Sequence, residues 1–171
     1  DLIVNFCNKN NILFHRGSLN DVSKRIIEIL NIYKYENFIR VNGDSPFISS
    51  LIIKKAIKIF KKENPDLVTN IFPRSYPKGL SIEILNSQKF ISSYKNQNSS
   101  QKEHVTKYFY DNSSNYKIQN FKYSKDCSNI NLSVDTREDL KIIRKISKKI
   151  GNKKIDIDDL INTYKYAKKE I

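Results

Sequence analysis

The chain has 171 residues and a formal net charge of +13, with 39% hydrophobic and 11% aromatic residues. This composition is typical of a globular protein with one domain, and it excludes an intrinsically disordered chain. No apolar run reaches the length of a membrane span and no signal-peptide pattern opens the sequence, so we expect a cytoplasmic protein without a membrane partner.

The excess of positive charge gives only weak support for a nucleic-acid partner. There are 25 Lys but 6 Arg, together with 26 Ile, 20 Asn and 2 Ala. An AT-rich coding sequence produces this joint excess of Lys, Ile and Asn without selection for a partner, and the lysines are spread over several predicted helix faces. We therefore expect no nucleic-acid binding, and an anionic small substrate fits the charge equally well.

Hydrophobic periodicity predicts alternating helices and strands in the first half of the chain. Residues 1–10 have the apolar spacing of one helical face, and residues 11–17 (NILFHRG) are predicted as a short strand that Gly17 closes. A helix over 18–34 would take Ser18 as its N-cap. The next expected elements are a strand over 37–43, an amphipathic helix over 49–64 and a strand over 66–72.

A loop with two prolines and a glycine follows, over residues 73–79 (PRSYPKG). Residues 80–85 alternate like a half-buried strand. Beyond them we expect helices over 86–95 and 101–112, strands over 116–123 and 129–135, and helices over 136–151 and 155–171 that Thr136 and Asp156 cap. The alternation favours a three-layer α/β fold around a mostly parallel sheet, with one domain over residues 1–171.

Two aspartates stand where predicted strands end. Asp44 follows FIRVNG, and Asp135 follows NINLSV. Because the carboxyl ends of parallel strands share one edge of a sheet, the two side chains could meet there and hold a hard cation such as Mg²⁺. The alternative is that each caps the helix that follows it, although Ser45, Ser49 and Thr136 compete for those positions. Spacing alone leaves both interpretations open.

Five motifs occur together in the order of a known family. They are FHRGSLNDVSKRI, IRVNGDSPFIS, VTNIFPRSYPKGLSIEI, EHVTKYFYDN and LSVDTREDL. In this order and spacing they resemble the cytidylyltransferases, which include the acylneuraminate and 3-deoxy-manno-octulosonate cytidylyltransferases. The nearest branch is the spore-coat polysaccharide biosynthesis type. The resemblance extends from Phe14 to about Ile146.

The resemblance implies a Rossmann-like nucleotidyltransferase fold, similar to that of the GT-A glycosyltransferases. The implied reaction joins CTP to a sialic-acid-like or other acidic sugar, and it yields a CMP-sugar and pyrophosphate for surface-polysaccharide biosynthesis. By motif match, Asp44 and Asp135 fall on the family's metal-binding aspartates, which implies a catalytic Mg²⁺ ion. Arg74 and Lys78 lie in a loop that the family uses near the sugar, where a guanidinium suits a carboxylate or phosphate.

Four other matches imply substrate-binding residues. Arg16 and Gly17 in HRGS lie where the family's sugar-nucleotide loop begins, although Gly17 is equally typical of a turn. Arg40 matches an arginine of the nearest branch, and it could instead be paired within the structure. Glu83 matches a family acid. Ser81 stands where the nearest branch usually has Asp, which leaves the sugar specificity open.

A histidine and an insertion complete the implied features. His104 in EHVT matches a family histidine that could bind substrate or take a proton from the attacking hydroxyl, and a histidine on a helix is also commonly structural. Members of the family are often dimers. The segment 86–123 is the expected insertion that could mediate dimerisation or contact the substrate.

One part of the family pattern is missing from the resemblance. The family opens with a strand and a loop containing Gly, Ser, Arg and Lys that holds the CTP phosphates and the cytosine, and the first match in this sequence lies after that loop. We therefore expect an N-terminally incomplete fold and an inactive chain in this form. The rival interpretation is a non-catalytic relative or a basic nucleic-acid-binding module, whose affinity would fall steeply with salt and show no preference for CTP.

Overall fold

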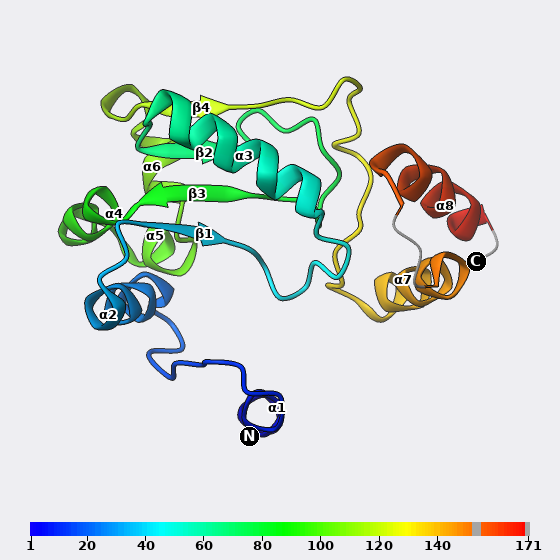
Figure 1. The fold of residues 1–171 in the computed structure, drawn as a ribbon, viewed down its shortest axis with the longest axis horizontal. Helices are drawn as coiled ribbons and strands as arrows, with labels where there is room; N and C mark the ends of the chain where they lie inside the picture. Colours follow the sequence, from blue (N-terminus) through cyan, green and yellow to red (C-terminus); the bar gives the residue numbers. More distant parts are fainter. Residues whose placement is uncertain (152–154, 170–171) are drawn as a thin grey trace. The chain divides into compact units, whose positions relative to one another are not determined.

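The computed structural model describes residues 1–151 and 155–169 (Figure 1). Its elements are α1 (Leu2–Lys9), α2 (Val22–Tyr33), β1 (Asn37–Arg40), α3 (Ser50–Glu63), β2 (Leu67–Thr69), β3 (Glu83–Asn86), α4 (Ser87–Ser93), η1 (Tyr94–Asn96), α5 (Ser99–Glu103), α6 (Lys107–Asp111), η2 (Ser113–Asn115), β4 (Ile118–Asn120), α7 (Arg137–Ile150) and α8 (Ile157–Lys169). None of these helices is both long and apolar enough to cross a bilayer.

The four short strands form one sheet in the order β1-β3-β2-β4. β2 and β4 are parallel, with Leu67 opposite Ile118 and Thr69 opposite Asn120. Because β2 and β4 are neighbours in the sheet but not along the chain, a crossover that contains β3 and several helices joins them. The helices and this sheet make a mixed α/β fold, which confirms the predicted fold class.

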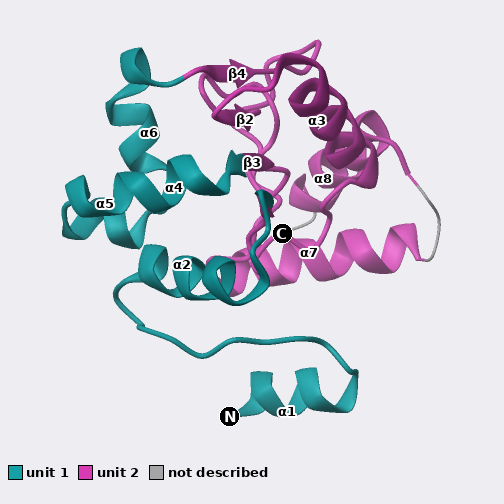
Figure 2. Cartoon of the chain, turned by 60° about the vertical axis from the view of Figure 1, so that its left-hand side comes forward, with its two compact units in different colours: residues 1–38, 85–116 teal, residues 39–84, 117–171 magenta. Residues whose placement is uncertain are grey.

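The chain divides into two compact units (Figure 2). Unit 1 comprises residues 1–38 and 85–116, and unit 2 comprises residues 39–84 and 117–171. The division passes through β1 and through β3. Each unit therefore contains segments that are distant in sequence, and each has its own set of buried side chains.

In unit 2, the amphipathic helix α3 packs against β2 and β4. Its buried side chains Ile52, Ala56 and Phe60 recur every four residues, which is the spacing of one helical face. Burying a large apolar side chain of this kind contributes about 1.5–3 kcal/mol relative to leaving it exposed. The helix ends as predicted, because Asn64 takes the left-handed conformation (φ 43°) and Pro65 cannot continue the helix.

An aromatic cluster forms the interior of unit 1. The ring centroid of Phe90 lies 5.3 Å from that of Phe38 and 6.3 Å from that of Phe109. The rings of Phe109 and Tyr116 are 4.6 Å apart. Because Phe90 and Phe109 are fully buried, these contacts tie residues 85–116 to the N-terminal part of the chain.

Two predicted strands were wrong. Residues 12–17 adopt no regular secondary structure, and residues 129–135 form a single isolated bridge, between Asn131 and Lys78. Residues 129–135 have the apolar alternation of a strand, and Ile130 and Leu132 are buried, but the backbone of this segment forms no strand ladder in the described residues. The segment 11–17 instead has three consecutive apolar residues, which are exposed. An apolar pattern therefore leaves open whether the backbone finds a long partner.

Two helix predictions needed correction as well. The helix predicted over 18–34 begins at Val22, because the Asp21 carboxylate accepts the N–H of Lys24 (2.8 Å) and so provides the N-cap. Ser18 instead accepts the N–H of Asp21 (3.0 Å) in the turn before the helix. The helix predicted over 101–112 is divided into α5 and α6.

Candidate active site

Backbone hydrogen bonds bring three segments of unit 2 together. The N–H of Lys78 donates to Ile130 O, and the N–H of Leu132 donates back to Lys78 O, each at 2.9 Å. Two residues further on, the N–H of Val134 donates to Asp44 O, also at 2.9 Å. Residues 130–134 are therefore bonded both to the proline-rich loop and to the Gly-Asp-Ser-Pro corner. Asp135 follows directly after the residue that binds Asp44.

The close approach of these segments depends on Gly79. It has φ +86°, a conformation that side-chain-bearing residues rarely adopt, and a Cβ added there would lie 2.5 Å from the carbonyl carbon of Leu132. The same Cβ would lie 2.7 Å from the nitrogen of Ser133. Both obstacles are backbone atoms, which cannot move aside as the end of a side chain can. Gly79 is thus required by the packing of the loop on residues 130–134.

The structure excludes helix capping as the role of either aspartate. Asp44 lies well before α3, whose N-cap is Ser49, and its Oδ1 accepts the Ser45 hydroxyl at 2.9 Å. The N-cap of α7 is Thr136, and Oδ2 of Asp135 accepts the Ser133 hydroxyl at 2.9 Å. The Ser45 hydroxyl therefore orients Asp44, whereas the Ser133 hydroxyl lies 2.6 Å from Asn131 Oδ1 as well as 2.9 Å from Asp135. Neither aspartate caps a helix.

The turn that carries Asp135 is stabilised by Asp139. This carboxylate accepts the N–H of Asp135 (3.2 Å), the N–H of Thr136 (2.9 Å) and the side-chain amide of Asn131 (3.1 Å). Partial desolvation is the largest single influence and would raise the pKa of Asp139, but the hydrogen bonds together lower that pKa below its usual value. A negative charge at this position also suits the N-terminus of α7.

Two carboxylates are available for a cation that a substrate would share. Among the described residues, no group of three or more His, Cys, Asp or Glu side chains that could hold a metal ion is found. Asp44 and Asp135 could contribute two carboxylates, because the backbone of Asp44 is hydrogen-bonded to Val134, the residue before Asp135. Mg²⁺ is commonly bound by one or two carboxylates, with phosphate oxygens and waters completing its shell.

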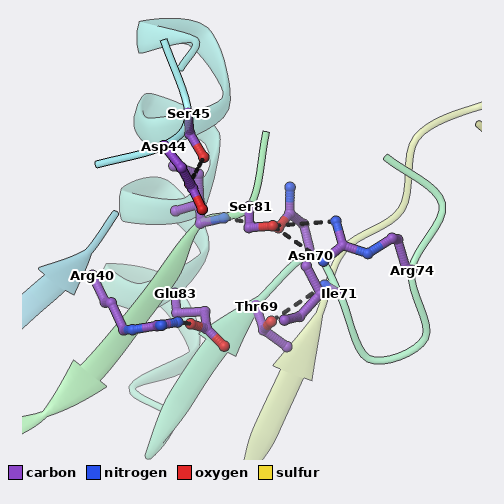
Figure 3. Close-up of polar contacts among 10 residues, drawn as sticks. Arg40, Asp44, Ser45, Thr69, Asn70, Ile71, Arg74, Ser81 and Glu83 are labelled. Atoms are coloured by element: carbon purple, nitrogen blue, oxygen red, sulfur yellow. Dashed lines mark hydrogen bonds and ion pairs between the residues drawn. The ribbon is translucent and has the colours of Figure 1, made fainter. Parts of the chain in front are cut away.

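A buried amide holds the base of the proline-rich loop. Asn70, which is fully buried, donates from Nδ2 to Leu80 O (2.8 Å) and accepts the N–H of Ile82 at Oδ1 (2.9 Å). Arg74 lies within the loop and donates from both terminal nitrogens to the Ser81 hydroxyl, at 3.2 and 3.1 Å (Figure 3). Sequence reasoning missed Asn70, because an asparagine after a strand is indistinguishable from an ordinary turn residue.

Arg40 and Glu83, both predicted to bind substrate, form an ion pair with each other. The distance from Nη1 of Arg40 to Oε2 of Glu83 is 2.6 Å, and the Glu83 side chain is 1% exposed against 28% for Arg40 (Figure 3). Removing Arg40 would take the ion-pair partner away from the buried Glu83 carboxylate, which is costly at a buried position. The alternative interpretation, that Arg40 is paired within the structure, is therefore confirmed. Substrate binding by Arg40 and Glu83 stays a prediction. Lys78 is exposed.

The other predicted residues lie in unit 1. Arg16 is exposed and lies 3.4 Å from the Asp1 carboxylate. Gly17 lies against α2, where an added Cβ would approach Oε2 of Glu28 to 2.7 Å. His104 is exposed and ends α5, with its N–H donating to Ser100 O at 2.9 Å. The structure thus brings Asp44, Asp135, Arg74 and Lys78 onto bonded segments of unit 2, whereas the roles of Arg16, Gly17 and His104 stay predictions.

The chain is similar in sequence to a protein family and to two curated proteins. The sequence model of a family described as cytidylyltransferase matches residues 1–169. An uncharacterized protein of Methanocaldococcus jannaschii is 30% identical over 164 residues, which cover 94% of this chain and 66% of that protein. The spore coat polysaccharide biosynthesis protein SpsF of Bacillus subtilis is 24% identical over 157 residues, covering 90% and 64%. The chain thus spans about two thirds of the length of these relatives.

A solved structure is also similar to the chain. It is the structure of a cytidylyltransferase from Leptospira borgpetersenii, with a TM-score of 0.92 and 25% sequence identity. The similarity covers 99% of this chain and 72% of that one. The described fold is therefore shared with a cytidylyltransferase over almost its entire extent.

Proposed function

Because the chain belongs to the cytidylyltransferase family, we propose that it transfers a cytidylyl group from CTP to a sugar. The observation that carries this proposal is the hydrogen bond between Val134 N–H and Asp44 O, which sets two acidic segments side by side. Two carboxylates on neighbouring segments suit the binding of a nucleoside triphosphate together with a divalent cation. The products would be a CMP-sugar and pyrophosphate.

In the proposed reaction a sugar hydroxyl oxygen attacks the α-phosphorus of CTP. A new phosphorus–oxygen bond forms to the sugar, the bond from the α-phosphorus to the bridging oxygen breaks, and pyrophosphate leaves with its electron pair. The hydroxyl proton passes to a general base. Asp44 and Asp135 would hold Mg²⁺, which supplies charge neutralisation on the phosphates and holds the reacting groups in line.

We propose an acidic sugar as the acceptor. Arg74 and Lys78 place two cationic side chains on the loop that hydrogen-bonds to residues 130–132. A guanidinium recognises a carboxylate through two parallel hydrogen bonds, and an exposed ammonium adds a point charge. The loop therefore suits an anionic acceptor better than a neutral one. Surface-polysaccharide biosynthesis is the proposed setting, in keeping with the similarity to SpsF.

The test is pyrophosphate release by the purified full-length protein. Each of CTP, UTP, ATP and GTP is offered with Mg²⁺ and a panel of neutral and acidic sugars. We expect release from CTP alone, and we expect Asp135→Asn to reduce it by about 100-fold or more. Asp126→Asn is the matched control, because Asp126 is an exposed aspartate that accepts the N–H of Ser128 in another loop. No release from CTP, or equal losses in the two variants, would contradict the proposal.

A further inference from the structure

The side chain of Asn131 hydrogen-bonds to two residues that flank Asp135 along the chain. Its Nδ2 donates to Oδ1 of Asp139 at 3.1 Å, and its Oδ1 accepts the N–H of Ser133 at 3.0 Å. The Ser133 hydroxyl lies 2.6 Å from the same Oδ1 and 2.9 Å from Oδ2 of Asp135. Asn131 thus joins a carboxylate of α7 to the segment that carries Asp135.

Asn131 is itself fixed by the backbone around it. The N–H of Lys78 donates to Ile130 O, and the N–H of Leu132 donates to Lys78 O, each at 2.9 Å. Ile130 and Leu132, the residues on either side of Asn131, are also buried. The Asn131 amide therefore meets its partners from a fixed point of the proline-rich loop's contact surface.

Asp139 holds the backbone at Asp135 and does more than cap α7. Capping uses the reciprocal bonds with Thr136, in which the Thr136 hydroxyl accepts the N–H of Asp139 and the carboxylate accepts the N–H of Thr136. The same carboxylate also accepts the N–H of Asp135 at 3.2 Å and the amide of Asn131. These two bonds are not needed for a capping box, and both lead to Asp135.

Chemistry fixes the direction of each hydrogen bond in this network. The N–H of Ser133 can only donate, so the Asn131 carbonyl must face it and Nδ2 must face Asp139. A carboxylate only accepts, so Asp139 suits all of its partners. In Asp139→Asn, the new NH₂ group would face either the amide of Asn131 or the N–H groups of Asp135 and Thr136. Donors would meet in both orientations, and a bond that supports Asp135 would be lost.

We propose that Asp139 and Asn131 are positioning residues for cation binding by Asp135. Asp139 holds the backbone of Asp135, and Asn131 holds Ser133, whose hydroxyl contacts the Asp135 carboxylate. Groups that orient a metal-binding carboxylate affect metal affinity nearly as strongly as the carboxylate itself. This inference rests on the proposed function, because it concerns one of the two carboxylates of the same site.

The experiment measures Mn²⁺ affinity by electron paramagnetic resonance with CTP present, against a blank without protein. It compares the natural full-length protein with Asp139→Asn, Asn131→Asp and the double exchange that carries both substitutions. The control is Asp156→Asn, because Asp156 is likewise an aspartate at the start of a helix and accepts the N–H of Asp159 in α8 at 2.8 Å. The control should bind Mn²⁺ as the natural protein does.

The single and double variants have different expected results. Asp139→Asn should weaken Mn²⁺ binding by roughly tenfold. Asn131→Asp should weaken it by about as much, because its carboxylate would face that of Asp139. The double exchange should return the affinity to within about threefold of the natural value, since an amide at position 139 then donates to a carboxylate at position 131 and every donor again meets an acceptor.

An effect of charge alone predicts the opposite sign for one variant. Asn131→Asp adds a negative charge near the site, which would tighten Mn²⁺ binding. That result would overturn the inference, as would natural affinity in Asp139→Asn, an equal loss in Asp156→Asn, or no recovery in the double exchange. If the natural protein binds no Mn²⁺ beyond the blank, the proposed cation site itself fails; if it binds and only the variants depart from expectation, the inference fails alone.

Discussion

Residues 12–17 of unit 1 and residues 129–135 of unit 2 are both irregular, yet they are fixed in different ways. The first segment contacts α2 through the side chain of His15, whose Nε2 lies 2.8 Å from Oε2 of Glu28. The N–H of Ile12 makes a local backbone bond to Cys7 O at 2.9 Å. The second is bonded through its backbone to Lys78 and Asp44. Backbone bonds leave less freedom than contacts between long side chains, so the segment before Asp135 is the more precisely positioned of the two.

The largest effect is expected for Gly79→Ala, because its Cβ would meet the backbone of Leu132 and the residue has a positive φ. We expect a loss of about 3 kcal/mol in the free energy of unfolding, measured by urea denaturation. Gly43→Ala is the control, since an added Cβ there meets no described atom within 4 Å. Equal stability of the two variants would show that residues 130–134 can move away from the loop.

A somewhat smaller loss is expected for Asn70→Ala. The substitution leaves Leu80 O and Ile82 N–H without their side-chain partner, and each lost bond at a buried backbone group costs about 1 kcal/mol. We therefore expect a total loss of about 2 kcal/mol, together with faster amide hydrogen exchange at Ile82. Normal exchange at Ile82 would mean that Asn70 does not hold the loop.

Gly17→Ala tests residues 12–17, the segment that contacts α2 through side chains. Its Cβ would approach Oε2 of Glu28 to 2.7 Å and Cγ of Arg25 to 3.0 Å, and both atoms belong to flexible side chains that can move aside. We expect a loss of about 1 kcal/mol or less, again from urea denaturation. A loss as large as that of Gly79→Ala would contradict the distinction between backbone-held and side-chain-held segments.

The smallest effect is a pH dependence in unit 2. Desolvation, followed by hydrogen bonding to Asp158, raises the pKa of Tyr123 from 10.0 to about 12. Because the folded-state pKa is the higher one, this tyrosine stabilises the protein fully below pH 10, and the contribution is lost as the pH rises through about 12. In urea denaturations between pH 10 and about 12, Tyr123→Phe should remove this decrease in the free energy of unfolding. A tyrosinate absorbance titration in which all tyrosines ionise near their ordinary pKa would contradict this prediction.

Much of the fold could be predicted from the sequence because the signals of a helix come from residues close together along the chain. The four-residue spacing in α3 and the Thr136–Asp139 capping box of α7 are both visible in the residues. Strand pairing is not local, and so the backbone bonds of residues 129–135 could not be predicted from alternation. We predicted from the ends of two expected strands that the segments carrying Asp44 and Asp135 could meet. In the structure they are joined by the hydrogen bond from Val134 N–H to Asp44 O.

The supporting residues of the site escaped prediction for a related reason. Gly79 looks like any turn glycine, and only the position of Leu132 shows why a larger residue cannot replace it. Ser81 was noticed for its identity, but its contact with Arg74 depends on the path of the whole loop. Charged residues of a site can be predicted from their side-chain chemistry. The residues that orient them can be identified only from the three-dimensional structure.

In the proposed function, Asp44 and Asp135 hold one cation together with CTP. The most direct measurement is a Mn²⁺ titration followed by electron paramagnetic resonance, with CTP present, for the natural full-length protein, Asp44→Asn, Asp135→Asn and the double variant. We predict that each single substitution weakens Mn²⁺ binding by at least about tenfold and that the double variant is little worse than either. Unchanged Mn²⁺ affinity in either single variant, or fully additive losses in the double variant, would contradict a shared site.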